Sequence, residues 1–323
     1  MDFENKIRTA LKQFPTISKK IDLDPLLKKV KSKNNLKKGN YKGINPLLCI
    51  LHNSLYNKKR VQNLINTLKE SNSYKIKELI KWELESYHIL NDLEKNLKNV
   101  QDEPGLKTSI QLLITSFYDG YSEIEIGSLL FSTFGNIVFQ PKLNNGSPAD
   151  HRFTFNDIEY FIEVKTPHFG QKYSDSLEKY SVNALSGEVP KAFERPSSLD
   201  RLYEVLLEAV RKFDGCLDDL NTLIIIDITN SDIKEDTIDD ALLGEEYLLK
   251  NNNKNGLKLI SHRDHWTYFK HDKRLNKINY LIWYKRYYDY TGIITYRYRI
   301  YEINPTNIDH KSLIAIFENK KPQ

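Results

Sequence analysis

The sequence predicts an α/β fold with the core order helix, strand, strand, strand, helix, strand. Three observations support this class. Apolar residues recur near helical spacing through residues 104–133, and residues 151–164 have the composition of a strand hairpin. Residues 222–227 form a continuous apolar run, which is typical of a strand that is buried on both faces.

A glycine and a proline mark the ends of the first core helix and of the strand after it. The spacing over residues 104–133 predicts one or two helices, and Gly135 is a suitable residue to end the second one. Residues 136–140 predict a short strand. Pro141 closes this strand because proline has no N–H to donate to a ladder. A polar loop then leads to Asp150.

The hairpin follows this loop directly. Residues 151–155 predict its first strand, and residues 158–164 predict its second strand. Asn156 and Asp157 stand between them, and both residue types tolerate the unusual backbone angles of a tight turn.

The second strand of the hairpin places charged residues on one face. Side chains alternate between faces along a strand, so Phe161, Glu163 and Lys165 should share one face. Ile162 and Val164 should share the other face. A hairpin of this length also brings Asp150 opposite the Glu163 end of the second strand, so two carboxylates and one ammonium are expected to converge there.

The later elements are predicted from periodicity and composition. A helix is expected from residue 196 through about residue 212, with serine as its N-cap. Past residue 227 the predicted elements are a helix over 232–250, a loop over 251–256, and strands over 280–284 and 293–301.

The N-terminal third of the chain is predicted to be helical and basic. Apolar residues between 64 and 97 predict a long amphipathic helix or a helix pair. A polar run that ends at Pro104 and Gly105 is the best candidate boundary. The chain therefore divides into a helical domain over residues 1–103 and a second domain over residues 104–323.

Charge is distributed unevenly along the chain. The net charge is +5, but residues 1–100 contain 21 Lys and Arg against 10 Asp and Glu. This balance of +11 leaves −6 for the remaining residues. Such a surface attracts phosphates, or it is simply a solvated lysine-rich surface. The two interpretations explain the charge about equally well, and phosphate contact is preferred only because of the motif at Asp150 and Glu163. The densest cluster consists of Lys28, Lys29, Lys31, Lys33, Lys37, Lys38 and Lys42.

Composition also limits the class of protein. The 323 residues include no apolar stretch long enough for a membrane span, and the N-terminal residues lack the apolar segment of a signal peptide. Cys49 and Cys216 are the only cysteines, which argues against a disulfide framework. A cytoplasmic protein without a membrane partner is expected.

The hairpin carries a resemblance to a known family. Asp150 followed by Glu163, Val164 and Lys165 resembles the motif of the PD-(D/E)xK nuclease superfamily, which is restriction-endonuclease-like. The match departs from the motif in its first half, where Ala149 separates the proline from the aspartate. The resemblance covers roughly residues 108–227.

The resemblance implies a fold and a metal site. The expected fold is an αβββαβ core with a mixed sheet flanked by helices, preceded by a helical region and followed by a strand-rich extension. Asp150 and Glu163 would bind Mg²⁺, for which Mn²⁺ can substitute, and the Val164 carbonyl would add a ligand. Lys165 would orient or deprotonate the attacking water.

The family often carries one further acidic residue on the first core helix. Glu125 is the preferred candidate because it stands ten residues before Gly135 in a mostly apolar helix. Glu123 is the alternative. Both are also explained as solvated carboxylates on a helix surface.

The resemblance implies a nucleic-acid substrate, most often DNA. A role in restriction or phage defence is favoured, although DNA repair or recombination is not distinguished by the residues. A homodimer and a partner subunit of a defence system are both left open. The residues expected to contact phosphate are Gln171, Lys172, Lys191, Arg195 and Arg201. For each of them, a solvated position on the surface explains the sequence equally well.

Other interpretations compete with the nuclease. The chain could be a nucleic-acid-binding module that has lost catalysis, or Glu163 and Lys165 could be a coincidental surface ion pair. A zinc site at His262 and His265 is disfavoured because no cysteine pair accompanies them. The arginines of residues 293–301 are better explained by a polar outer face of a strand than by phosphate contacts.

Overall fold

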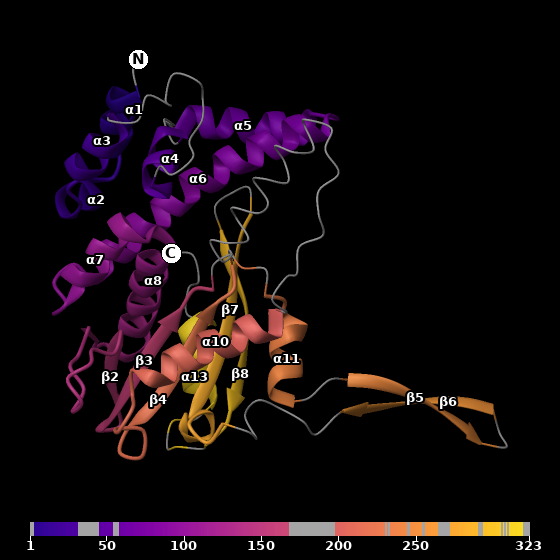
Figure 1. The fold of residues 1–323 in the computed structure, drawn as a ribbon. Helices are drawn as coiled ribbons and strands as arrows, with labels where there is room; N and C mark the ends of the chain where they lie inside the picture. Colours follow the sequence, from indigo (N-terminus) through magenta and orange to yellow (C-terminus); the bar gives the residue numbers. More distant parts are fainter. Residues whose placement is uncertain are drawn as a thin grey trace, which may run out of the picture.

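The protein is an α/β structure built around a six-stranded mixed open sheet with helices on both faces (Figure 1). This α/β class confirms the coarse prediction from the sequence. The computed structural model describes residues 3–31, 45–53, 58–167, 198–229, 231, 233–243, 246–253, 256–263, 272–289, 293–304, 306, 308 and 310–318.

The sheet has the strand order β1-β2-β3-β4-β7-β8. β1, β2 and β3 are antiparallel neighbours, β3, β4 and β7 run parallel, and β8 returns antiparallel to β7. The last residues of β3, β4 and β7 and the first residues of β2 therefore lie at one end of the sheet, here termed its carboxyl end. The strands are β1 Val138–Phe139, β2 His151–Phe155, β3 Ile158–Lys165, β4 Asn221–Asp227, β7 Tyr280–Tyr288 and β8 Ile294–Glu302.

The predicted hairpin is confirmed in its strands and in its turn. Asn156 has a φ of 51° and Asp157 has a φ of 63°, which is the left-handed backbone that a two-residue type I′ turn requires. Alternation along β3 also agrees with the prediction. Ile162 and Val164 pack into one apolar cluster, whereas Phe161 packs into another on the opposite face of the sheet.

Two sets of helices cover the two faces of the sheet. Where the sequence predicts one or two helices, the structure has two, α7 Leu106–Thr115 and α8 Phe117–Phe134, and Gly135 ends α8 with a φ of 74°. α8 and α13, His310–Glu318, pack on the face that contains Ile162. α10 Ser198–Arg211 and α11 Glu235–Leu243 pack on the opposite face, and the short η2, Leu275–Lys277, lies beside α10.

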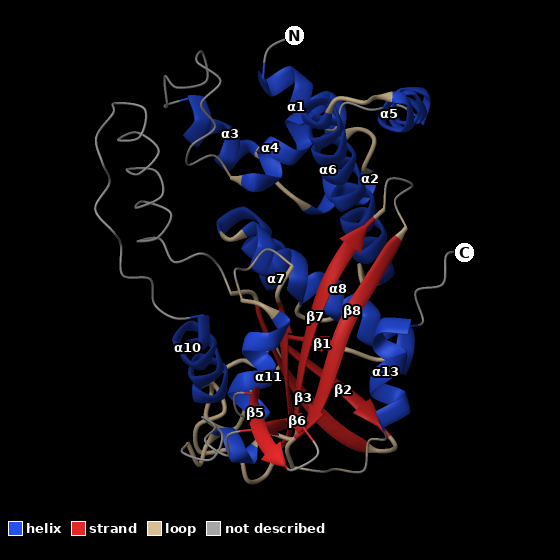
Figure 2. Cartoon of the chain, turned by 90° about the vertical axis from the view of Figure 1, so that its right-hand side faces the viewer, coloured by secondary structure: helices blue, strands red, loops and turns tan. Residues whose placement is uncertain are grey.

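The described part of residues 3–99 is mainly helical, as predicted, and the amphipathic segment is a helix pair rather than one helix. Its elements lie beyond the carboxyl end of the sheet, toward which β7 and β8 extend (Figure 2). Buried side chains of most of these helices and of α8 belong to one apolar cluster, while Ile65, Ile80 and Leu84 form a separate small cluster. No described helix is sufficiently long and apolar to span a bilayer. The helices are α1 Phe3–Leu11, α2 Pro15–Lys20, α3 Asp24–Lys31, α4 Pro46–Asn53, α5 Lys58–Glu70 and α6 Tyr74–Asn99.

Two predictions past β4 were wrong. The helix expected over residues 232–250 ends at Leu243, and Glu246–Asn253 is instead the strand β5. β5 pairs with β6, Gly256–Arg263, along its whole length, so its described residues 251–253 are not a loop. The three consecutive asparagines are poor helix formers, and strand pairing satisfies their backbone groups. Figure 1 shows this hairpin extending away from the main sheet.

The close packing of α7 against α8 depends on Gly120. A Cβ atom at this position would lie 2.5 Å from the Leu113 nitrogen and 2.8 Å from the Leu112 carbonyl carbon. Because backbone atoms cannot move aside as a side chain can, we predict that Gly120→Ala destabilises the protein by about 1–3 kcal/mol. Urea denaturation would measure this change.

Gly135→Asn is the matched control for this substitution. No atom lies within 4 Å of the position of its Cβ atom, and asparagine tolerates the left-handed backbone. Equal unfolding midpoints for the two variants would contradict the packing argument.

Candidate active site

Asp150 is fixed at the carboxyl end of the sheet by backbone pairing. Its N–H donates to the Ile162 carbonyl at 3.0 Å, which extends the β2–β3 ladder by one residue. Its Oδ2 accepts the Val164 N–H at 2.8 Å. The carboxylate thus accepts a backbone N–H of β3 for which β2 supplies no carbonyl. Only 2% of Asp150 is exposed. The side chain is therefore held against β3 by the fold itself.

Glu163 lies on β3 and is fully buried. Its Oε1 lies 3.1 Å from the Lys165 ammonium and 2.5 Å from the Lys212 ammonium. Lys212 follows the last residue of α10, and its Nζ also lies 2.9 Å from Oδ1 of Asp150. One ammonium thus bridges carboxylates from two adjacent strands. Lys165 makes a second ion pair with Glu208 of α10, at 2.8 Å.

The loop before β2 holds the end of α10 beside these strands. The Asn145 side-chain amide donates to the Lys212 carbonyl and to the Asp214 carbonyl, both at 2.9 Å. Figure 1 shows α10 lying across the sheet, and Lys212, which follows its last residue, contacts Asp150. This anchoring explains how a residue far along the sequence enters the cluster.

Burial and neighbouring charges both shift the pKa values of Glu163 and Lys212. Burial raises the pKa of Glu163 well above its ordinary value, and the nearby Asp150 charge raises it further. Burial lowers the pKa of Lys212, but Asp150 and Glu163 raise it more, so that the net shift is upward. The ammonium of Lys212 therefore stays charged between the two carboxylates.

The structure brings together the three residues on which the sequence motif depends. Asp150, Glu163 and Lys165 meet at the carboxyl end of the sheet. Val164 contributes its N–H to Asp150, and a role for its carbonyl as a metal ligand stays a prediction. The sequence analysis missed Lys212, because nothing local distinguishes this lysine from the many others in the chain.

Glu123, rather than the preferred Glu125, lies beside this cluster. Glu123 accepts the Ser109 hydroxyl at 2.7 Å and the Gln140 side-chain amide at 3.3 Å. The Gln140 N–H donates to the Asp150 carbonyl at 2.9 Å, so the same residue contacts both acids. Burial and the Asp150 charge raise the pKa of Glu123 from 4.5 to about 8.

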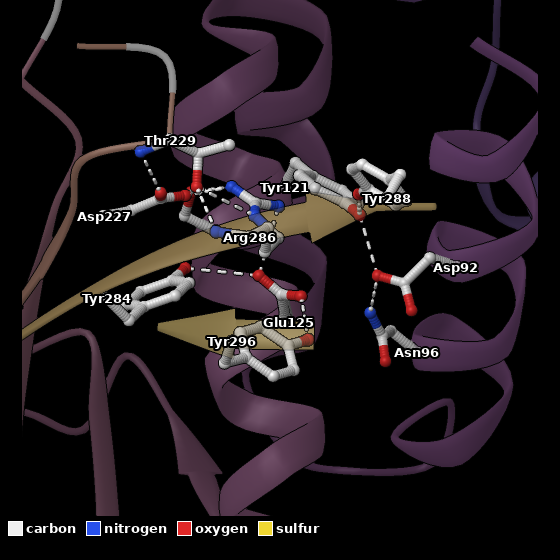
Figure 3. Close-up of polar contacts among 11 residues, drawn as sticks. Asp92, Asn96, Tyr121, Glu125, Asp227, Thr229, Tyr284, Arg286, Tyr288 and Tyr296 are labelled. Carbon is white, nitrogen blue, oxygen red and sulfur yellow. Dashed lines mark hydrogen bonds and ion pairs between the residues drawn. The ribbon is translucent and has the colours of Figure 1, made fainter. Parts of the chain in front are cut away.

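Glu125 belongs to a second, fully buried cluster (Figure 3). Residues two apart on a helix are separated by about 200°, so Glu125 faces away from Glu123. Its Oε2 lies 3.1 Å from Nη1 of Arg286 and accepts the Tyr284 hydroxyl at 3.2 Å. Arg286 also pairs with Asp227, the last residue of β4. The structure thus does not bring Glu125 to Asp150 and Glu163.

The Arg286 cluster connects the sheet to the N-terminal helices. The guanidinium lies over the Tyr121 ring, with its carbon 4.4 Å from the ring centroid. The Tyr121 hydroxyl donates to Asp92 of α6 at 2.7 Å and lies 2.6 Å from the Tyr288 hydroxyl. Asn96 donates to the same carboxylate at 2.9 Å (Figure 3). These contacts join α6, α8 and β7.

The residues proposed to contact phosphate are largely untested by the structure. Arg201 lies near the start of α10 and is half-buried. The two arginines of β8 pair with carboxylates of α11, because Arg297 lies 3.1 Å from Glu235 and Arg299 contacts Asp239. Gln171, Lys172, Lys191, Arg195, most of the Lys28–Lys42 cluster and His265 lie outside the described residues.

The geometry of Asp150 and Glu163 fits a hard divalent cation. Among the described residues no group of three or more His, Cys, Asp and Glu side chains is arranged around one metal position. Mg²⁺ needs no such group, since it is commonly held by one or two carboxylates together with waters and substrate phosphates. The Lys212 ammonium contacts one oxygen of each carboxylate, so both oxygens already converge on one cation.

Comparison of this chain with protein-family models, curated proteins and solved structures found no match.

The raised pKa of Glu123 predicts a pH-dependent stability. The folded state favours its protonated form, so its contribution is complete below pH 4.5 and is lost as pH rises to about 8. Over this window the free energy of unfolding should fall by up to about 1.4 kcal/mol per pH unit from this group. In Glu123→Gln, that part of the decrease should disappear when urea denaturation is measured from pH 5 to pH 8. Parallel stability curves for the two proteins would contradict the assignment.

The Arg286 cluster predicts a large effect of removing one cation. Arg286→Met leaves Asp227 and Glu125 buried without their partner, which should cost about 3–5 kcal/mol of stability. Arg297→Met is the matched control, because this arginine makes an exposed ion pair and its loss should change stability little. Similar melting temperatures for both variants would show that Arg286 is not needed to compensate buried charge.

Proposed function

We propose that this chain is a Mg²⁺-dependent nuclease that hydrolyses phosphodiester bonds in DNA and acts in restriction or phage defence. The observation that carries the proposal is the convergence of Asp150, Glu163 and Lys165 at the end of two adjacent strands. A coincidental surface ion pair would not explain why both carboxylates are buried and directed at the same cation.

The topology supports the same proposal. The segment from α8 through β1, β2, β3 and α10 to β4 has the order helix, three strands, helix, strand. Its first three strands are antiparallel, and β4 joins β3 in parallel. This arrangement is compatible with a restriction-endonuclease-like core, to which β7 and β8 add two further strands.

The carboxylates have the role of holding the metal. Asp150 and Glu163 would bind Mg²⁺, and the bound ion supplies a positive charge that offsets the charge building on the phosphate during attack by water. The Asp150 charge contributes to the raised pKa of Glu123, so the two carboxyl groups lie near each other. We therefore propose Glu123, in place of Glu125, as the additional acidic residue from the first core helix.

Lys165 is better suited to orienting water than to removing its proton. Burial lowers the pKa of this lysine, but the Glu163 charge and the hydrogen bond to Glu208 raise it by more. The side chain therefore remains an ammonium that donates hydrogen bonds. We propose that it positions the attacking water and contacts the phosphate, and that the proton of this water passes to bulk solvent.

The test is a cleavage assay with the purified full chain and two variants. Circular plasmid, linear duplex, single-stranded DNA and RNA would each be incubated with Mg²⁺, Mn²⁺ or EDTA. We expect metal-dependent products from the wild type. Asp150→Asn and Lys165→Met should reduce the rate by roughly 10²–10³-fold, since each removes a charge that helps to stabilise the reacting phosphate or to orient the water. Binding of the substrate by Lys165→Met should persist.

Lys277→Met is the control, because Lys277 makes an exposed ion pair with Asp218 away from the proposed site. Undiminished cleavage by Lys165→Met would contradict the mechanism. Salt-sensitive binding without products from the wild type on any substrate would instead favour a binding module without catalysis.

A further inference from the structure

Lys212 occupies the position between the two carboxylates that are proposed to hold the metal. Its Nζ lies 2.9 Å from Oδ1 of Asp150 and 2.5 Å from Oε1 of Glu163. A cation could contact these oxygens only from about the same place. The inference drawn from this position rests on the proposed function.

Cations already compensate the carboxylates of this cluster without a metal ion. Lys212 contacts Asp150 and Glu163, and Lys165 contacts Glu163 and Glu208. A divalent ion placed among these groups would lie close to two ammoniums. Like charges at such short range repel strongly in a partly buried site, so the ion can enter only if an ammonium leaves.

Lys212 is the ammonium that can leave. Lys165 is the last residue of β3, has 14% of its side chain exposed, and is held by Glu208 as well as Glu163. Lys212 has 32% of its side chain exposed and follows the last residue of α10. Its flexible four-carbon stem can turn the ammonium toward solvent while Asn145 holds its backbone carbonyl.

We propose that Lys212 fills the cation position in the free protein and moves to a substrate phosphate when the metal ion binds. The metal ion then takes the two carboxylates, and the phosphate takes the displaced ammonium. Metal and nucleic acid therefore bind cooperatively. Because such coupling is reciprocal, nucleic acid raises the metal affinity by the same factor as metal raises the nucleic-acid affinity.

The experiment measures Mn²⁺ affinity rather than cleavage. Mn²⁺ would be titrated into the full chain and followed by electron paramagnetic resonance, with and without a phosphorothioate oligonucleotide that resists hydrolysis. We expect Lys212→Met to bind Mn²⁺ about tenfold or more tightly than the wild type when no oligonucleotide is present. The oligonucleotide should raise the affinity of the wild type by a similar factor and that of Lys212→Met by little.

Two controls complete the design. Lys277→Met should bind Mn²⁺ like the wild type, since it removes an equal charge from an exposed ion pair elsewhere. Lys212→Gln repeats the test with a polar side chain. The comparison of wild-type Mn²⁺ affinity with and without the oligonucleotide does not depend on the folding of any variant.

The outcomes separate this inference from the proposed function. Equal Mn²⁺ affinities for Lys212→Met and the wild type, or a wild-type affinity unaffected by the oligonucleotide, would overturn the role of Lys212. If metal-dependent cleavage by the wild type is nevertheless lost in Asp150→Asn, the proposed function holds and only the role of Lys212 is contradicted. No Mn²⁺ binding by any of the proteins, with or without oligonucleotide, would overturn both.

Discussion

Compensation of buried carboxylates at the carboxyl end of the sheet is the constraint on which the structure depends. Asp150 and Glu163 lie toward one face of the sheet, and Glu125 and Asp227 lie toward the other, all nearly inaccessible to solvent. A buried carboxylate without a cation would cost several kcal/mol or would become protonated. The arrangement of α8 and α10 around this end of the sheet places cations, carboxylates and hydroxyl donors where this cost is offset.

The two faces meet the constraint with different cations, and the difference has functional consequences. Arg286 has 1% of its side chain exposed and contacts both Glu125 and Asp227, so its charge has no path to solvent. Arginine stays protonated and its planar donors suit two fixed acceptors. Lys212 is a partly exposed point charge on a flexible stem. The Arg286 cluster therefore holds α8 and the sheet together, and on the opposite face we propose a cation position at which Lys212 exchanges with a metal ion.

Local signals predicted the hairpin, the buried strand β4, the end of α8 at Gly135 and the convergence of Asp150 with Glu163. Each of these depends on alternation, turn chemistry or strand length, which are properties of short segments. The choice between Glu123 and Glu125 could not be made from the sequence, because both lie in a stretch of α8, residues 120–130, that is buried on all sides. Lys212 could not be found because its position depends on a loop holding the end of α10. The β5–β6 hairpin was missed because its apolar residues fit a helix as well as a strand.

Anomalous diffraction from crystals grown with saturating Mn²⁺ would test the central claim most directly. The account predicts a peak between Asp150 and Glu163, with carboxylate oxygens about 2.0–2.4 Å away and the Lys212 ammonium displaced toward solvent or a phosphate. Absence of that peak, with Lys212 still bridging the two carboxylates, would show that the site is a structural ion-pair cluster. The proposal that Asp150 and Glu163 hold a catalytic metal ion would then be contradicted.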